Sequence, residues 1–192
     1  TIMDRRTIIK QISILTGAAF VGGQIFIQSG CKTDGLATKA LLSTDQIALL
    51  DEIGETIIPQ TDSPGAKSTN IGAFLHKMVT DCYSTEEQKI FIEGLENIKQ
   101  SFETKYSASF ISANTDQKTT FLNDVNTEAI AYRKAKKYED PEHYFVMMKQ
   151  LTILGYFTSE IGATKALNYI AVPGKYDGSY PYKKGDKAWA TS

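Results

Sequence analysis

The chain has 192 residues, which is enough for one domain with extensions. Hydrophobic residues make up 42% of it, close to the average for globular proteins, so we expect a sizeable core. The formal net charge of −1 at pH 7 argues against a nucleic-acid partner, because proteins that bind nucleic acids usually present a basic face. The two histidines, His76 and His143, fit no metal-ligand spacing, and we place them on helix surfaces or at helix ends.

The N-terminal residues form the pattern of an export signal. A basic stretch at 4–10, DRRTIIK, precedes an apolar stretch at 12–30 that is rich in glycine and alanine. This pattern resembles the twin-arginine signal, which directs folded cargo, often with a bound cofactor or partner, to the twin-arginine translocase. The matching residues are Arg5, Arg6, Ile8, Ile9 and Lys10. Asp4 stands where a Ser or Thr usually precedes the arginine pair.

The sequence leaves the fate of this segment open. The apolar stretch is slightly shorter than the roughly 20 residues of a membrane-spanning helix, so an uncleaved membrane anchor is one alternative. Residues 29–31 (SGC) resemble a lipoprotein cleavage site, which would place a lipid on Cys31, although Gln28 replaces an aliphatic residue of that pattern. We therefore expect a periplasmic protein held at the membrane, with a twin-arginine signal or membrane anchor at 1–31 and a linker at 32–42.

The first helix of the predicted helical part begins at a capping box. Ser43 and Gln46 have the spacing with which the serine caps the helix and the glutamine reaches back to it. Apolar residues follow at helical spacing until Pro59 ends the helix. A loop of turn-forming residues is predicted at 59–70.

The next helix is predicted to start near Asn70. Its apolar residues recur three, four, seven, eight and eleven positions after Ile71, the last of them being Cys82. This spacing predicts that Cys82 is a buried core thiol, and burial argues against a disulfide with Cys31.

Three further helices and a short final one are predicted from similar signals. Ser84 and Glu87 form a second capping box that opens a long helix toward Tyr106. A weaker pattern covers 115–136. The next helix is predicted to open with Asp140 as its cap and Pro141 at its first position, and Met147 and Met148 within it are predicted to fill core space. Ser159 would cap the last helix, at 161–167.

These elements predict an all-α fold, a bundle of five or six helices at 43–170, with an N-terminal signal or anchor helix. A long irregular tail follows at 171–192, because glycine and proline interrupt it. The tail carries four aromatic residues with polar groups, a type that protein interfaces favour: Tyr176, Tyr180, Tyr182 and Trp189. The tail either contacts a partner, covers the chain's own bundle, or does both.

The sequence contains no motif that indicates catalysis or a bound cofactor. There is no GxSxG elbow for a catalytic serine, no dinucleotide-binding glycine motif and no CxxCH haem attachment site. We therefore expect that this chain is not an enzyme by itself and holds no cofactor.

Two separated motifs resemble the gluconate 2-dehydrogenase subunit 3 family. The first is ETIIPQTDSPGAK at 55–67, and the second is GYFTSEIGATKALNYIAVPGKYDG at 155–178, followed by KAW at 187–189. The helix LSTDQIALLDEI before the first motif and the twin-arginine leader fit the same family. The resemblance spans about residues 42–190.

This resemblance implies a non-catalytic small subunit. In such complexes the large subunit is a flavoprotein of the glucose–methanol–choline oxidoreductase type, which binds FAD and oxidises a sugar, a sugar acid or a polyol. A multihaem cytochrome c often accepts the electrons. The small subunit escorts the flavoprotein through the twin-arginine route and supports its fold.

The motif match selects residues for the partner interface or for shaping the loops beside it. They are Pro59, Thr61, Pro64, Gly65, Gly155, Tyr156, Tyr169, Pro173, Gly174, Tyr176 and Trp189. Two other functions remain as alternatives. One is an exported lipoprotein or anchored module that holds a carbohydrate or another protein with its aromatic tail. The other is an enzyme whose active site no motif reveals.

Overall fold

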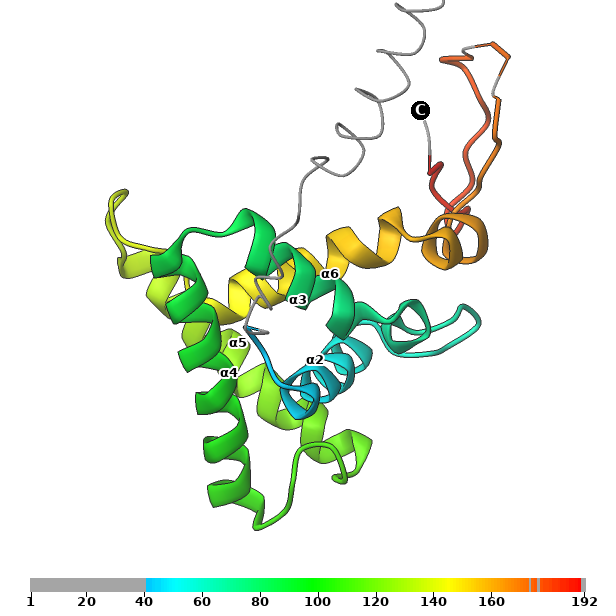
Figure 1. Cartoon of the computed structure of the whole chain (residues 1–192). Coiled ribbons are helices and arrows are strands. Elements are labelled where there is room, and N and C mark those ends of the chain that lie inside the picture. The colour runs from blue at the N-terminus through cyan, green and yellow to red at the C-terminus, as the bar shows by residue number, and fades with distance from the viewer. Residues whose placement is uncertain (1–40, 173, 176, 191–192) are drawn as a thin grey trace, which may run out of the picture. The chain divides into compact units, whose positions relative to one another are not determined.

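The computed structural model describes residues 41–172, 174–175 and 177–190. In chain order the elements are α2 (Thr44–Ile57), the 3-10 turn η1 (Ala66–Thr69), α3 (Ile71–Cys82), α4 (Thr85–Tyr106), α5 (Thr115–Ala135), α6 (Tyr144–Thr158) and the π-helical turn η2 (Gly162–Ala166). The described residues contain no strand, so the all-α prediction is confirmed for them (Figure 1). The predicted signal or anchor helix lies outside the described residues.

Both predicted capping boxes are present. At the start of α2, the Gln46 backbone N–H donates to the Ser43 hydroxyl at 3.3 Å, and the Ser43 N–H donates to the Gln46 side chain at 2.9 Å. At the start of α4, Ser84 and Glu87 exchange the same two bonds at 3.4 and 2.8 Å. Each box satisfies backbone donors that a helix start otherwise leaves without partners.

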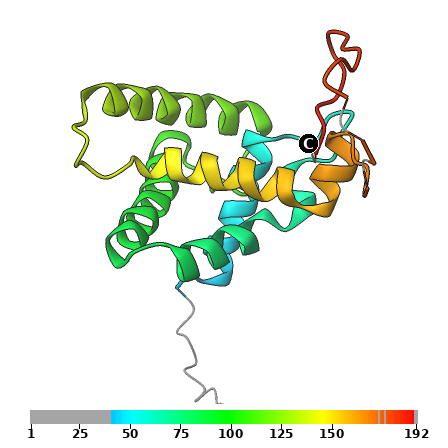
Figure 2. The same cartoon turned by 90° about the horizontal axis from the view of Figure 1, so that it is seen from above.

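Helix α6 is the central element of the described fold. It packs against α2, α3, α4 and α5, and Figure 2 shows it lying between α5 and α3. It contributes six buried side chains to the core: Phe145, Met147, Met148, Leu151, Thr152 and Tyr156. The prediction that Met147 and Met148 fill core space is confirmed, because they are 5% and 0% exposed.

A second part of the core is aromatic. Phe102 of α4 lies within 5.2 Å, centroid to centroid, of the rings of Tyr106, Phe110 and Phe121. These contacts join α4 to α5 and to the loop between them. Leu42, just before α2, is 1% exposed and also belongs to the core.

Two predictions at helix ends are wrong. Cys82, the last residue of α3, is exposed and not buried. The next residue, Tyr83, takes the inward position and places its ring edge against Phe91.

The prediction of where α6 starts is also wrong. Its cap is His143, whose Nδ1 accepts the N–H of Phe145 at 3.2 Å, rather than Asp140. Asp140 instead accepts the Lys137 N–H within the preceding turn, and Pro141 stays outside the helix.

None of the helices in the described residues is both long enough and apolar enough to cross a bilayer.

Candidate partner interface

The loop after α2 is held in place by one carboxylate. The two oxygens of Glu55 accept the backbone N–H groups of Gln60 and Lys67, each at 2.9 Å. Gly65 lies directly against this carboxylate, and a Cβ atom there would come within 2.3 Å of both oxygens. A side chain at position 65 would therefore push the carboxylate away from the two amides that it organises.

The same loop is fastened to α6 by a buried tyrosine. The hydroxyl of Tyr156, a residue that is 1% exposed, donates to the carbonyl of Pro64 at 2.5 Å. The two residues are 92 positions apart in the sequence. Gly155 allows the helices to come this close, because a Cβ atom there would lie 2.4 Å from Phe74 and 2.7 Å from Ile71 of α3. The two family-like motifs thus meet in one structural unit, the motif junction, formed by the Glu55, Pro64, Gly65, Gly155 and Tyr156 contacts.

Charges on one side of the motif junction are paired. Glu52 of α2 forms ion pairs with Lys67 from the loop and, at 2.8 Å, with Lys118 from α5. Burial acts to raise the pKa of Glu52, but hydrogen bonds and charge from Lys118 and Lys67 outweigh burial and hold this pKa below its ordinary value. Glu52 therefore stays ionised and ties the loop to two helices.

The outer surface near the C-terminal end of α6 carries exposed apolar side chains instead of paired charges. Ile153, Leu154 and Phe157 of α6 are 46%, 46% and 40% exposed. Residues 150–164 contain a single charged side chain, Glu160. We call these three exposed residues the α6 apolar face. Large apolar side chains grouped on an otherwise uncharged surface are typical of interaction sites.

The chain beyond η2 forms a loop that closes on itself. Asn168 pairs with the segment around Trp189 through three hydrogen bonds of 2.8 Å, two between backbones and one from the Asn168 amide to the carbonyl of Lys187. Tyr180 places its ring edge on Trp189, with 5.5 Å between centroids. The described residues 171–190 contain no helix. Figure 1 shows this loop at the same end of the described fold as the loop after α2, and Figure 2 agrees.

The structure separates the residues selected from sequence into distinct positions. Pro64, Gly65, Gly155 and Tyr156 come together in the motif junction, with Pro64 half-buried and the other three buried. Pro59, Thr61, Tyr169, Gly174 and Trp189 are exposed. The remaining predicted residues lie outside the described residues: Pro173, Tyr176, Cys31, and the export residues Arg5, Arg6, Ile8, Ile9 and Lys10.

Sequence reasoning missed the residues that organise this region. Glu55 was part of the first motif but was not selected as an interface or loop-shaping residue. A carboxylate followed by a proline- and glycine-rich loop is the signal that would have indicated that it binds the backbone N–H groups of that loop. The exposure of the α6 apolar face was missed as well, because apolar residues occur around most of this helix and their spacing does not distinguish exposed from buried positions. In the described ranges, no group of three acidic, histidine or cysteine side chains is placed to hold a metal ion.

Comparison with known protein families decides the classification. The family model described as gluconate 2-dehydrogenase subunit 3 matches residues 44–174, about two thirds of the chain. The chain belongs to the gluconate 2-dehydrogenase subunit 3 family. The resemblance inferred from the sequence is thereby confirmed. No similar curated protein and no similar solved structure was found.

The match covers every contact of the motif junction. It runs from α2 through Gly174, so it includes the first motif and residues 155–174 of the second. The aromatic residues after Gly174, among them Tyr180, Tyr182 and Trp189, lie beyond the matched range.

Proposed function

We propose that this subunit 3 chain is the non-catalytic small subunit of an exported dehydrogenase and that it binds and stabilises a large FAD-dependent subunit. The family membership is the observation that carries this proposal, because subunit 3 denotes a component of a dehydrogenase complex. The large subunit would be of the glucose–methanol–choline type and would oxidise a sugar, a sugar acid or a polyol. FAD would belong to that subunit, and haem c to a cytochrome that accepts the electrons.

The surface of the chain supports a partner at the C-terminal end of α6. The α6 apolar face leaves three large side chains 40–46% exposed, and Tyr169, Tyr180, Tyr182 and Trp189 add aromatic surface after it. Tyrosine and tryptophan are enriched in the buried centres of protein interfaces. The motif junction contributes by fixing the loop after α2 before any partner arrives, so that less conformational entropy is lost on binding.

The export route is part of the proposal. The twin-arginine pattern at Arg5 and Arg6 would carry the folded complex across the membrane, which would supply a signal for a large subunit that has none. The complex would then stay in the periplasm, held at the membrane by the uncleaved N-terminal segment or by a lipid on Cys31.

Affinity purification from the native membrane fraction tests the subunit function. We expect the chain to co-purify with a flavoprotein that shows a flavin absorption spectrum and reduces a dye when sugars or sugar acids are added. A colourless chain recovered alone from unperturbed membranes would contradict the proposal, and screening of carbohydrates against the aromatic C-terminal segment would then test the binding-module alternative. The export step is tested separately by changing Arg5 and Arg6 to lysine, which should retain both subunits in the cytoplasm while leaving their association intact.

A further inference from the structure

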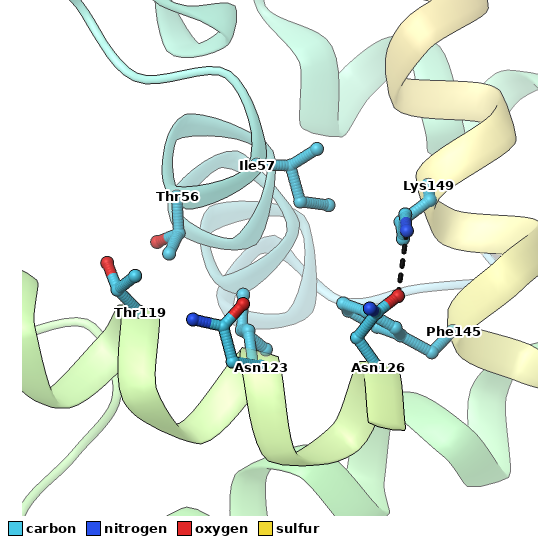
Figure 3. Close-up of a pocket in the computed structure, with 8 residues that line it drawn as sticks. Thr56, Ile57, Thr119, Asn123, Asn126, Phe145 and Lys149 are labelled. Carbon is cyan, nitrogen blue, oxygen red and sulfur yellow. Dashed lines mark hydrogen bonds between the residues drawn. The ribbon is translucent and has the colours of Figure 1, made fainter. Parts of the chain in front are cut away.

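A groove with several polar side chains lies between α2, α5 and α6. Its volume is about 190 Å³. It is lined by Thr56, Ile57, Thr119, Leu122, Asn123, Asn126, Phe145 and Lys149. We call it the amide groove. Figure 3 shows the two asparagines on α5, with Thr56 facing Thr119 from α2 and Lys149 entering from α6.

Lys149 provides a positive charge in this groove without a balancing negative charge. Its ammonium donates to the Asn126 side-chain oxygen at 2.7 Å and lies 6.0 Å from the centre of the Phe145 ring. Among the described residues, the side chain forms no ion pair. No lining residue is acidic. Glu52, one helical turn before Thr56 in α2, is already paired with Lys67 and Lys118, so the unpaired charge among the lining residues is positive and favours an anion.

The other polar groups are arranged to bind a neutral polar ligand group. Because an ammonium only donates, the oxygen of Asn126 must face Lys149, and its NH₂ group is left to donate elsewhere. The side-chain amide of Asn123 and the hydroxyl of Thr119 have no hydrogen-bond partner among the described residues. The Thr56 hydroxyl donates to the Glu52 carbonyl at 2.8 Å, so it is free to accept. The groove thus offers both donors and acceptors beside its single cation.

We propose that the amide groove binds a small hydroxycarboxylate. The Lys149 ammonium contacts the carboxylate, and the side-chain amides and threonine hydroxyls exchange hydrogen bonds with the hydroxyl groups. Amides and hydroxyls match ligand hydroxyls because both partners donate and accept. A volume of about 190 Å³ fits a ligand of a few carbon atoms. This proposal uses no feature of the subunit function and stands or fails independently of it.

The test is a titration of the full chain, purified in detergent, with three matched probes. D-glycerate carries a carboxylate and two hydroxyls, glycerol lacks the carboxylate, and acetate lacks the hydroxyls. The readout is the NMR signals of the side-chain amides of Asn123 and Asn126. We expect saturable shifts with glycerate at a dissociation constant on the order of 1 mM, as befits a ligand of this size, and binding at least ~10-fold weaker for each of the other probes.

Variants connect the signal to the groove. Lys149→Met should weaken glycerate binding at least ~10-fold, Lys149→Arg should retain part of it, and Lys165→Met, a lysine far along the chain, should leave it unchanged. Asn123→Ala removes an exposed amide without touching the core and should weaken binding even if Lys149→Met alters the fold. The absence of saturable shifts with glycerate, equal binding of acetate and glycerate, or unchanged binding in Asn123→Ala would each overturn the proposal.

Discussion

The Tyr156 side chain is almost fully buried, and its hydroxyl is the only part that makes a polar contact in the described residues. It donates to the carbonyl of Pro64, so it fastens the loop after α2 to α6. A buried carbonyl that loses its donor keeps the full cost of desolvation. At the scale of single residues, this bond and the Glu55 carboxylate determine the shape of the loop after α2.

Tyr156→Phe should therefore lower the free energy of unfolding by about 1–2 kcal/mol, because it removes the hydroxyl and leaves the Pro64 carbonyl unpaired. Urea unfolding followed by circular dichroism measures this change. Tyr180→Phe is the matched control, since Tyr180 is 59% exposed, and we expect a change within about 0.5 kcal/mol. Equal effects of the two substitutions would show that the buried bond contributes nothing.

At the scale of helices, α4 and α6 approach each other closely at Gly94. A Cβ atom at this position would lie 2.1 Å from Cγ of Tyr144, which is the first residue of α6. Burial of the Tyr144 side chain raises its pKa to about 12, and the negative charge of Glu128 contributes a smaller part of this rise. The glycine is thus required by the packing of two helices and not by the conformation of α4 itself.

Gly94→Ala tests this packing, because helix propensity and packing predict opposite signs. Alanine should stabilise an isolated helix by about 1 kcal/mol relative to glycine. We expect the clash with Tyr144 to outweigh this gain and lower the free energy of unfolding by a net amount of about 1–2 kcal/mol, measured by urea denaturation. Glu93→Ala, at the exposed neighbouring position, should be close to neutral. A stabilised Gly94→Ala variant would show that α4 and α6 are not packed as described.

The cap of α6 gives the fold a dependence on pH. Burial lowers the pKa of His143, although the charges of Glu128 and Glu142 oppose it. Its ring contacts the rings of Tyr132 and Tyr144, and its Nδ1 must be unprotonated to accept the Phe145 N–H. The folded state thus favours the neutral ring, whereas the unfolded chain takes up a proton near the ordinary pKa of about 6.5.

We therefore expect the contribution of His143 to stability to be complete above about pH 6.5 and to be lost as the pH falls through the lower pKa of the folded state. Thermal unfolding between pH 7.5 and 5 should show this decline. In His143→Asn the side chain can still cap but does not titrate, so its stability should fall less over the same range. Parallel curves for the two proteins would contradict the assignment.

At the scale of the whole molecule, the surface of the described residues divides into charged and uncharged parts. The exposed sides of α4 and α5 carry many charged residues, whereas the α6 apolar face carries none. In the proposed complex the large subunit covers the α6 apolar face. Burying three large apolar side chains stabilises an interface by several kcal/mol, at about 25 cal/mol per Å² of apolar surface.

The double substitution Leu154→Asp with Phe157→Asp should abolish co-purification of the flavoprotein, because it would place two carboxylates in an apolar contact. Both positions are exposed, so the free energy of unfolding of the isolated chain should stay within about 1 kcal/mol of the original. Ile130→Asp changes a 49% exposed residue of α5 and should retain the partner. Retention of the flavoprotein by the double variant would place the interface elsewhere.

Local signals in the sequence predicted most of the helices. The features that the sequence did not predict depend on contacts between residues that are far apart in the chain. The Ser43 and Ser84 capping boxes lie within four residues each, and both were confirmed. Asp140 was predicted to cap α6 because an aspartate followed by a proline is typical of a helix start. The same pair of residues suits a turn equally well, and Asp140 accepts the Lys137 N–H in such a turn. The role of Tyr156 depends on a carbonyl 92 residues earlier, which no local pattern reveals. The sequence motifs therefore identified the members of the motif junction without showing that they meet.

The uncharged end of α6 has a consequence for how much of this chain a cell should make. A copy without its partner exposes Ile153, Leu154 and Phe157 to water, and exposed apolar surface of this kind favours self-association as the protein concentration rises. Excess chains would be lost to aggregation and proteolysis, while excess flavoprotein would lack its escort. In the proposed complex, balanced synthesis of the two subunits thus follows from the exposed surface of a single helix.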